Sequence, residues 1–478
     1  MNTKSVFLIA LLLGFSISPI YARPRIMDMA QIGSGMVAKQ LCSGIFIQNR
    51  SKQDIQQHEL NPAQFDPRLK WFKSRIDLDK GEVQTSLFGL FKSYAGYSEG
   101  KGCAVYRHGE HSYQLQQYQM DSNLFPTGDV ADQELSKQLT WFPAMEKLVN
   151  QQLESEQNHK NGTRSIVIVH QGKLIYEQHV QGWNGQIPQN GYSMSKTISA
   201  ALLGIMLEQG KLKLEDDNLR PEWKDQRSKI TVNDLVTMQS GLDFHEIYNK
   251  NNDPGQMLYA VPSMSAYAAN KPLVYPLHSH FNYSTGDTNL LMAYLRHKAN
   301  MTDTEWLDYP QEVLFKPIGM RHVIFEQDAY GDYAGGSFVY ASALDWARFG
   351  LLFAQYGTWV DNKGQMQQIL PKDWVKYMMK PTTTSNCHYG AGIWNSQRKC
   401  VGDLPVIYNL SGFKGQLVYI VPKTKTVVVM MGFGDWNAYQ FMTDLLTTMQ
   451  LEFTLPLGKR ESSSNCNGLM KSDSEIEI

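Results

Sequence analysis

Two pairs of β-forming runs, far apart in the 478-residue chain, constrain the fold more than any other feature. One pair lies within residues 165–180 around a Gln-Gly-Lys turn, and the other lies within 416–431 around a Pro-Lys-Thr-Lys turn. Two such runs around a short turn indicate a β-hairpin. Helical patterns occupy segments before, between and after the hairpins: 141–157, 193–209, 231–238, 341–356 and 438–453. This order predicts an α+β fold, in which one antiparallel sheet from distant segments is flanked by helices and carries an inserted helical lobe.

The first 22 residues have the parts of a secretory signal peptide. Lys4 precedes an apolar stretch at 6–15 that is too short to span a bilayer, and Ala22 offers a small residue at a cleavage point. The sequence therefore predicts a signal peptide at 1–22 and a periplasmic or secreted protein; a short buried N-terminal helix is the alternative. No run of about 18 apolar residues follows, so no transmembrane segment is expected in the mature chain.

Composition along the chain predicts three further divisions. Residues 23–130 contain scattered Gly and Pro and are expected to form a β-rich or loop-rich N-terminal extension. Residues 131–455 contain both hairpins and the helical segments and are expected to form the main domain. Residues 456–478 are Ser-rich and polar, which is typical of a disordered tail.

The charge balance argues against one class of partner. The chain has 45 Lys and Arg residues against 46 Asp and Glu residues, a formal net charge of −1. A nucleic-acid-binding protein needs a basic surface to displace counterions from phosphates. We therefore expect no nucleic-acid partner, and the sequence leaves the oligomeric state open.

Five cysteines fit an oxidising compartment, where disulfides form by default. Cys42 and Cys103 both lie in the N-terminal extension and can pair with each other. Cys387 and Cys400 flank a short Gly-containing segment, which suggests a local bridge, and Cys466 is the odd one. Sequence alone does not fix connectivity, so both pairings are interpretations.

The segment Ser193-Met-Ser-Lys196 has the pattern S-x-x-K and opens a helical run after an Asn-Gly-Tyr loop. Residues three apart share one helix face, which places the Lys196 amine beside the Ser193 hydroxyl. Burial lowers a lysine pKa, so this amine can accept the serine proton and activate the nucleophile. An N-capping serine with a surface lysine is the alternative. The same pattern recurs, without the loop and helix, at 98–101, 396–399 and 411–414.

Two other motifs contain groups that suit acyl chemistry. Tyr283, in Phe-Asn-Tyr-Ser-Thr-Gly, can shuttle a proton near a lysine if neighbouring cations or hydrogen bonds favour its anion. Gly412 and Gly415 precede the second hairpin and allow close backbone approach to a ligand, so a backbone N–H there can face an oxyanion. An ordinary loop tyrosine and a plain glycine turn are the alternatives.

Several other kinds of site are not indicated. His278 and His280 alternate before Tyr283, but no acidic or histidine partner stands at ligand spacing, so no metal site is expected. There is no C-x-x-C pair, no G-x-S-x-G elbow, and no Walker or Rossmann glycine pattern. No cofactor is expected.

The motifs stand in the order S-x-x-K, then a tyrosine 90 residues on, then a Gly-containing strand near the C-terminus. This order resembles the penicillin-recognising serine hydrolases, and within them the class C β-lactamase-related group. That group includes D-alanyl-D-alanine carboxypeptidases, β-lactamase-fold esterases and 6-aminohexanoate-dimer hydrolases. The likeness spans about residues 164–434 and includes the segments 191–196 (GYSMSK), 230–242 (ITVNDLVTMQSGL), 315–320 (FKPIGM), 341–350 (ASALDWARFG) and 370–374 (LPKDW). Cys42-Ser-Gly44 and Gly102-Cys103 also resemble the leader region of the 6-aminohexanoate branch.

The resemblance implies a β-lactamase/transpeptidase-like fold, with 131–455 as the catalytic domain. Ser193 then corresponds to the acylated nucleophile, Lys196 to its proton partner, and Tyr283 to the tyrosine of the Y-x-N element. The oxyanion hole would consist of the backbone N–H groups of Ser193 and Phe413.

The sequence departs from the family pattern at two positions. Thr285 stands where the Y-x-N asparagine is expected. The Lys-Thr-Gly or His-x-Gly element reads Leu410-Ser411-Gly412, with no cation in register, and Phe413 replaces the histidine of a related G-H-x-G-Q pattern. Lys414 is adjacent, but side chains alternate along a strand, so it need not face the site. Ser411, Gly412 and Phe413 are therefore expected to bind an oxyanion or substrate without a cation.

These observations favour an exported serine hydrolase that cleaves an uncharged ester or amide through an acyl-enzyme on Ser193. The first alternative is a peptidoglycan D-Ala-D-Ala carboxypeptidase or β-lactamase, which the missing cation disfavours because their substrates carry a carboxylate. The second alternative is a non-catalytic binding protein of the same fold, which the altered third motif suggests.

Overall fold

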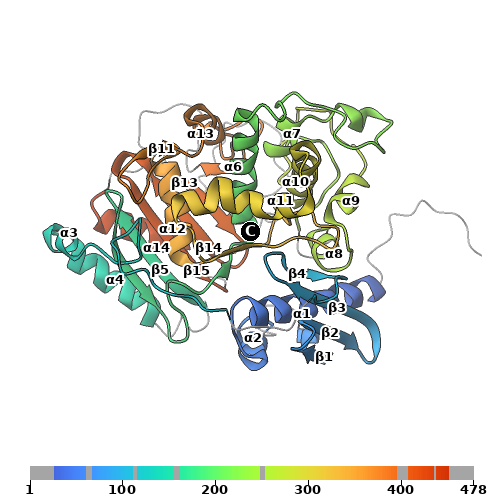
Figure 1. Cartoon of the computed structure of the whole chain (residues 1–478), viewed down its shortest axis with the longest axis horizontal. Helices are drawn as coiled ribbons and strands as arrows, with labels where there is room; N and C mark the ends of the chain where they lie inside the picture. Colours follow the sequence, from blue (N-terminus) through green and yellow to red (C-terminus); the bar gives the residue numbers. More distant parts are fainter. Residues whose placement is uncertain are drawn as a thin grey trace, which may run out of the picture.

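A six-stranded antiparallel sheet built from both ends of the main domain is the central element of the structure (Figure 1). The computed structural model describes residues 26–60, 67–110, 116–154, 162–247, 253–395, 407–434 and 438–451. The strand order is β12-β13-β14-β15-β5-β6. The strands are β5 (Thr163–His170), β6 (Lys173–His179), β12 (Trp394–Asn395), β13 (Tyr408–Gly412), β14 (Gln416–Val421) and β15 (Thr426–Gly432).

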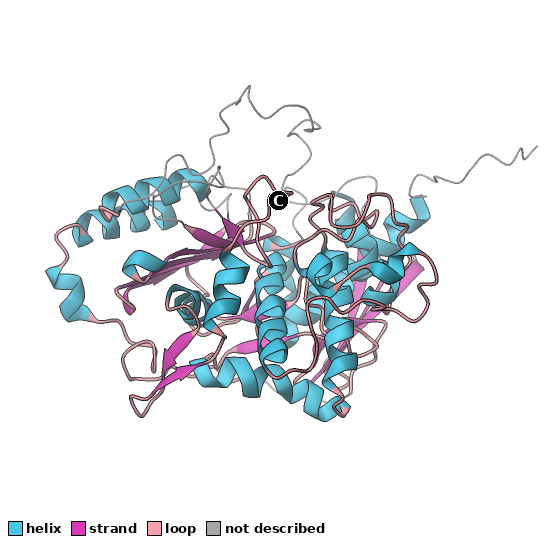
Figure 2. Ribbon diagram, turned by 90° about the horizontal axis from the view of Figure 1, so that it is seen from above, coloured by secondary structure: helices cyan, strands magenta, loops and turns pink. Residues whose placement is uncertain are grey.

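The two expected hairpins are confirmed as β5–β6 and β14–β15, and they join edge to edge through β15 and β5. In this pairing Val428 lies opposite Ile168 and Val429 lies opposite Val167. Every residue of β5, β14 and β15 is buried. The strands carry apolar side chains on both faces because helices cover both faces of the sheet (Figure 2).

Alternate residues of these strands belong to two separate cores, as the two-residue period of a strand requires. Val167, Val169 and Val427 pack with α12 (Ala343–Ala354) and α6 (Ser195–Glu208). On the other face, Ile166, Ile168 and Val428 pack with α4 (Phe142–Glu154) and α14 (Ala438–Thr448). The four helices correspond to four of the expected helical segments.

A helical lobe is inserted between β6 and β13, which confirms the expected α+β architecture. Its helices are α7 (Val232–Val236), α8 (Asp253–Tyr259), α9 (Met264–Ala269), α10 (Thr285–Ala299) and α11 (Asp303–Pro310). The expected short helix at 231–238 is α7, which begins with a capping box between Thr231 and Asp234. No helix among the described residues is long and apolar enough to span a membrane.

The N-terminal segment contains β-structure, as expected, but it begins with a 21-residue helix that was not expected, α1 (Ile26–Phe46). The helix packs on a four-stranded antiparallel sheet of β1 (Phe72–Asp77), β2 (Glu82–Leu87), β3 (Leu90–Ser98) and β4 (Gly102–Val105). We call residues 26–60 and 67–110 the N-terminal unit. Glycines at 33, 35 and 44 lower the helix propensity of this segment, so its sequence does not indicate a helix.

These glycines let α1 approach its neighbours closely. A Cβ on Gly35 would lie 1.7 Å from the backbone oxygen of Tyr259, at the end of α8. A side chain cannot fit at that separation, and a backbone carbonyl in a helix cannot easily move away. The N-terminal unit is therefore packed directly against the helical lobe (Figure 1).

A buried ion pair connects α1 to the main domain. The Lys39 amine contacts the Glu326 carboxylate, and the two side chains are 2% and 0% exposed. Glu326 also accepts hydrogen bonds from Ser43 Oγ at 2.9 Å and from the backbone N–H of Cys103 at 2.8 Å. Burial lowers the pKa of Lys39, and the charge of Glu326 opposes this effect. Removing either partner would leave an uncompensated buried charge, which typically costs about 3–5 kcal/mol.

One expected disulfide is present among the described residues. Cys42 of α1 is bonded to Cys103 of β4, with an S–S distance of 1.99 Å. Cys387 is also disulfide-bonded. Cys400 and Cys466 lie outside the described residues, so the Cys387–Cys400 pairing stays a prediction, as does the disordered tail at 456–478.

Candidate active site

Ser193 lies in a tight turn between a short strand and a long buried helix. β7 (Gln189–Asn190) leads into a 3₁₀ turn at Tyr192–Met194, and α6 begins at Ser195. The turn closes through the backbone N–H of Met194, which donates to Gly191 O at 3.0 Å. Ser193 is 7% exposed, so its hydroxyl is largely shielded from water at the start of the helix.

The Lys196 amine is buried and donates to three oxygen atoms. It contacts Ser193 Oγ at 3.0 Å, Thr285 Oγ1 at 2.9 Å and Gly336 O at 3.0 Å. Three acceptors match the three protons of an ammonium group. Burial lowers the pKa of Lys196 to about 8, although the negative charge of Glu246 acts in the opposite direction. The amine can therefore lose its proton within the physiological pH range.

Tyr283 lies beside the same amine. The Lys196 amine is 4.7 Å from the centre of the Tyr283 ring. Burial raises the pKa of Tyr283 well above its usual value, a hydrogen bond with Ser193 lowers it in part, and the charge of Glu246 adds to the rise. The expectation that the surroundings favour the Tyr283 anion is therefore wrong, because burial outweighs the neighbouring hydrogen bonds. Tyr283 is a neutral phenol next to the Ser193 hydroxyl.

An aromatic cluster packs around Tyr283. The ring centres of Tyr283 and Trp394 are 5.1 Å apart, and those of Tyr283 and Tyr389 are 5.6 Å apart. Phe281 packs on Tyr389 at 5.5 Å. These contacts restrict the orientation of the phenol.

The third motif lies directly against the turn that contains Ser193. A Cβ on Gly412, the last residue of β13, would lie 2.2 Å from Gly191 O, so only glycine permits this approach. Phe413 follows the strand, and its ring centre is 5.6 Å from that of Tyr192. The Lys414 amine lies 5.5 Å from the centre of the Phe413 ring. Ser411 is half-buried in the same strand.

The structure thus places the three motifs together, and it adds a residue that sequence reasoning missed. Glu246 accepts hydrogen bonds from the Thr285 backbone N–H at 2.7 Å and from Thr285 Oγ1 at 2.5 Å. Because Thr285 Oγ1 also contacts Lys196, the carboxylate is linked to the amine through one hydroxyl. No motif marks Glu246, which lies in a loop 39 residues before Thr285. The only hint in the sequence was that Thr285 replaces the Y-x-N asparagine, and this replacement does not indicate that Glu246 is its hydrogen-bond partner.

A buried acid, Asp287, lies at the start of α10. Burial raises the pKa of Asp287 to about 7, and hydrogen bonds with Ser240 and Ser284 limit the rise. Ser240 Oγ donates to Asp287 Oδ1 at 3.0 Å. The charges of Asp234 and Glu246 raise the pKa further, so Asp287 gains a proton more readily than an ordinary carboxyl.

The two histidines before Tyr283 do not converge. His278 contacts the buried carboxylate of Asp234, while the ring of His280 stacks on Tyr275 at 3.9 Å. In the part of the chain that the structure describes, no group of three His, Cys, Asp or Glu side chains is placed to hold a metal ion.

Comparison with known proteins identifies the family. The family model described as Beta-lactamase matches residues 146–467, which is more than half of the chain. The chain belongs to the β-lactamase family. The family match and the antiparallel sheet with flanking helices and an inserted lobe show that the fold is of the β-lactamase/transpeptidase type. Members of this family are generally serine hydrolases. No curated protein sequence matches the chain.

Solved structures of the same fold cover about two thirds of this β-lactamase family member. One, described as a 6-aminohexanoate-dimer hydrolase from Bacillus anthracis, is 22% identical with a TM-score of 0.51, and covers 62% of this chain and 79% of its own. Another, described as a β-lactamase from Bacteroides dorei DSM 17855, is 15% identical with a TM-score of 0.50, and covers 64% and 98%. At these identities the likeness concerns the fold.

Proposed function

We propose that the protein is a serine hydrolase that cleaves an ester or amide bond through an acyl-enzyme on Ser193. The observation that carries the proposal is the 3.0 Å contact between the Ser193 hydroxyl and a buried lysine amine whose pKa is lowered to about 8. A serine hydroxyl is a weak nucleophile until a base removes its proton. The neutral form of Lys196 supplies that base one helical turn away.

The reaction proceeds in two balanced steps. Ser193 Oγ bonds to the acyl carbon while its proton moves to Lys196. The bond between that carbon and the leaving group then breaks as the neutral phenol of Tyr283 gives the leaving group a proton. The phenol is restored by the proton held on Lys196. Water then attacks the acyl carbon with the same groups moving protons in reverse, and the acid is released. No cofactor takes part.

The developing oxyanion is held by the backbone N–H groups of Ser193 and Phe413. The contact of Gly412 with Gly191 O supports this role, because it brings the end of β13 against the nucleophile turn. One such donor typically contributes about 3–4 kcal/mol to transition-state stabilisation. A backbone donor does not depend on its side chain, so Phe413 can replace the family histidine.

Labelling with a fluorophosphonate probe tests the nucleophile. Wild-type protein should be labelled at Ser193, and Ser193→Ala should lose labelling, because the probe reacts only with an activated serine. Ser98→Ala is the matched control, since Ser98 belongs to another S-x-x-K sequence, in β3. Equal labelling of wild type and Ser193→Ala would remove Ser193 from its role. Absence of labelling in the wild type would favour a binding protein that has lost turnover.

The pH dependence of kcat/KM tests the base. Activity should rise as pH increases towards 8 because Lys196 must lose its proton before it can act. Glu246→Gln removes a negative charge that raises this pKa, so the acid limb should move to lower pH. Asp243→Asn, on the same loop, removes a charge that does not act on Lys196 and should leave the limb in place. An unchanged limb in Glu246→Gln, with the protein folded, would contradict the assignment.

We propose uncharged esters or amides as substrates, because Leu410-Ser411-Gly412 stands where the family has Lys-Thr-Gly or His-x-Gly and therefore has no cation in register. A β-lactamase or D-Ala-D-Ala carboxypeptidase is the second candidate, and the position of Lys414 above Phe413 is the observation in its favour. We expect p-nitrophenyl esters to be hydrolysed with a kcat/KM at least about 10-fold above that for nitrocefin or a D-Ala-D-Ala peptide, since an unpaired carboxylate is costly to bury. Rapid nitrocefin hydrolysis that is lost in Lys414→Met would establish the second candidate instead.

We also propose that the protein is exported, with cleavage after Ala22. The Cys42–Cys103 disulfide supports this proposal because such bonds persist in oxidising compartments. Expression of the full chain in a bacterial host should place the protein in the periplasm or the medium with Arg23 as its first residue. N-terminal sequencing of each fraction measures this, and an uncut chain confined to the cytoplasm would contradict it.

A further inference from the structure

Tyr192, the residue before Ser193, has an unusual backbone conformation. Its φ is +45°, in the left-handed region that bulky side chains rarely adopt. Such a conformation persists only where the surrounding structure imposes it, and it is often found at functional sites. The direction in which Ser193 Oγ and the Ser193 N–H point depends on this backbone. What holds Tyr192 therefore bears on the nucleophile.

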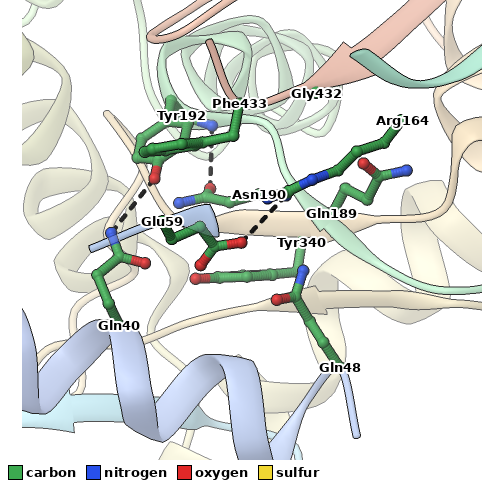
Figure 3. A pocket seen from close by; sticks show the side chains of 10 residues that line it. All are labelled: Gln40, Gln48, Glu59, Arg164, Gln189, Asn190, Tyr192, Tyr340, Gly432 and Phe433. Carbon is green, nitrogen blue, oxygen red and sulfur yellow. Dashed lines mark hydrogen bonds and ion pairs between the residues drawn. The ribbon is translucent and has the colours of Figure 1, made fainter. Parts of the chain in front are cut away.

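Several contacts hold Tyr192, and one of them comes from the N-terminal unit. Its backbone N–H donates to Asn190 Oδ1 at 2.9 Å, and its hydroxyl accepts a hydrogen bond from Gln40 Nε2 at 3.2 Å (Figure 3). Its ring packs on Phe413 at 5.6 Å and on Phe433 at 6.2 Å. Tyr192 thus contacts, through its chain and its ring, the two residues whose N–H groups face the proposed oxyanion.

The part of α1 that carries Gln40 is anchored at the residue before it and at the second residue after it. Lys39 forms the buried ion pair with Glu326, and Cys42 is bonded to Cys103. Gln40 itself is 3% exposed. A side chain fixed in this way can impose a position on its partner, whereas a mobile surface glutamine cannot.

The surroundings of this hydrogen bond form a specific polar interface. Gln40 and Glu59 of the N-terminal unit line a small cavity together with Arg164, Asn190 and Tyr340 of the main domain (Figure 3). The Arg164 guanidinium pairs with Glu59 at 3.0 Å across this boundary. Buried polar contacts of this kind fix one relative position of two surfaces, because any shift leaves charged or polar atoms unpaired.

We propose that the N-terminal unit acts as a positioning element of the active site, with Gln40 holding the nucleophile turn through the hydroxyl of Tyr192. The proposal rests on the proposed function of Ser193 and assigns a role to a region that the family match does not cover. Gln40 and Tyr192 do not touch the reacting atoms. Their loss should therefore affect turnover more than substrate binding.

A double-mutant cycle in kcat tests the coupling. Gln40→Leu and Tyr192→Phe each remove one partner of the hydrogen bond while keeping most of the side-chain volume. We expect each to lower kcat about 10-fold with KM within about two-fold, since small displacements of a nucleophile have effects of this size. The double variant should be no slower than Gln40→Leu alone, because that variant has already lost the hydrogen bond to Tyr192, together with the one between Gln40 and the Tyr259 side chain. Additive losses, or an unchanged kcat in Gln40→Leu, would overturn the proposal.

Gln48→Leu is the matched control. Gln48 lines the same cavity and donates to Pro188 O at 2.8 Å, so its replacement also removes one buried hydrogen bond between the N-terminal unit and the main domain. We expect its kcat to stay within about two-fold of the wild type, because it does not contact Tyr192. An equal loss in Gln40→Leu and Gln48→Leu would show general weakening of the interface and would contradict a positioning role.

Hydrogen–deuterium exchange of the peptide containing residues 189–196 provides a readout without substrate. Exchange should be faster in Gln40→Leu than in the wild type or Gln48→Leu, because the turn is held less firmly. Together with the labelling experiment, this measurement distinguishes failure of the proposed hydrolase function from failure of the positioning role. Labelling that persists in Ser193→Ala would refute the proposed function, whereas unchanged exchange in Gln40→Leu would refute the positioning role alone.

Discussion

The Lys196 amine is buried among three oxygen atoms that come from three separate parts of the chain: the turn before α6, the start of α10 and the segment before β9 (Val339–Ala341). A buried amine loses its hydration, and each proton without an acceptor would add to that cost. Thr285 and Gly336 must therefore hold fixed positions relative to Ser193. Burial lowers the amine's pKa, while the three acceptors keep it in place. The same environment thus determines both the geometry and the acid–base properties of the site.

Much of this arrangement was predictable from local sequence rules. Valine-rich runs around short turns gave the two hairpins, and the three-residue spacing of S-x-x-K placed Lys196 beside Ser193 because side chains three apart share a helix face. The sequence predicted that both hairpins belong to one antiparallel sheet, but the pairing of β15 with β5 became visible only in the structure. These predictions depend on interactions between residues close in sequence, or on a pattern repeated along a strand.

Other features depend on contacts that no local pattern encodes. Glu246 reaches Thr285 from a loop without periodicity, so its role became visible only when the chain was folded. Helix α1 contains glycines, which lower its helix propensity, and Gly35 is needed there because the helix packs closely against the backbone of Tyr259. The pKa of Tyr283 moved opposite to expectation because burial, which the sequence does not report, outweighs its hydrogen bonds. In each case a long-range contact overrode a short-range preference.

The Lys39–Glu326 pair has a practical consequence for the design of truncated proteins. The family match begins at residue 146, and a shortened protein that started there would lack α1, β4 and the amine that neutralises Glu326. A buried carboxylate and the apolar surface under α1 would then face solvent or an empty gap. The family match therefore does not coincide with a fragment that is complete in charge and packing, and a fragment that keeps the Lys39–Glu326 pair must include the N-terminal unit.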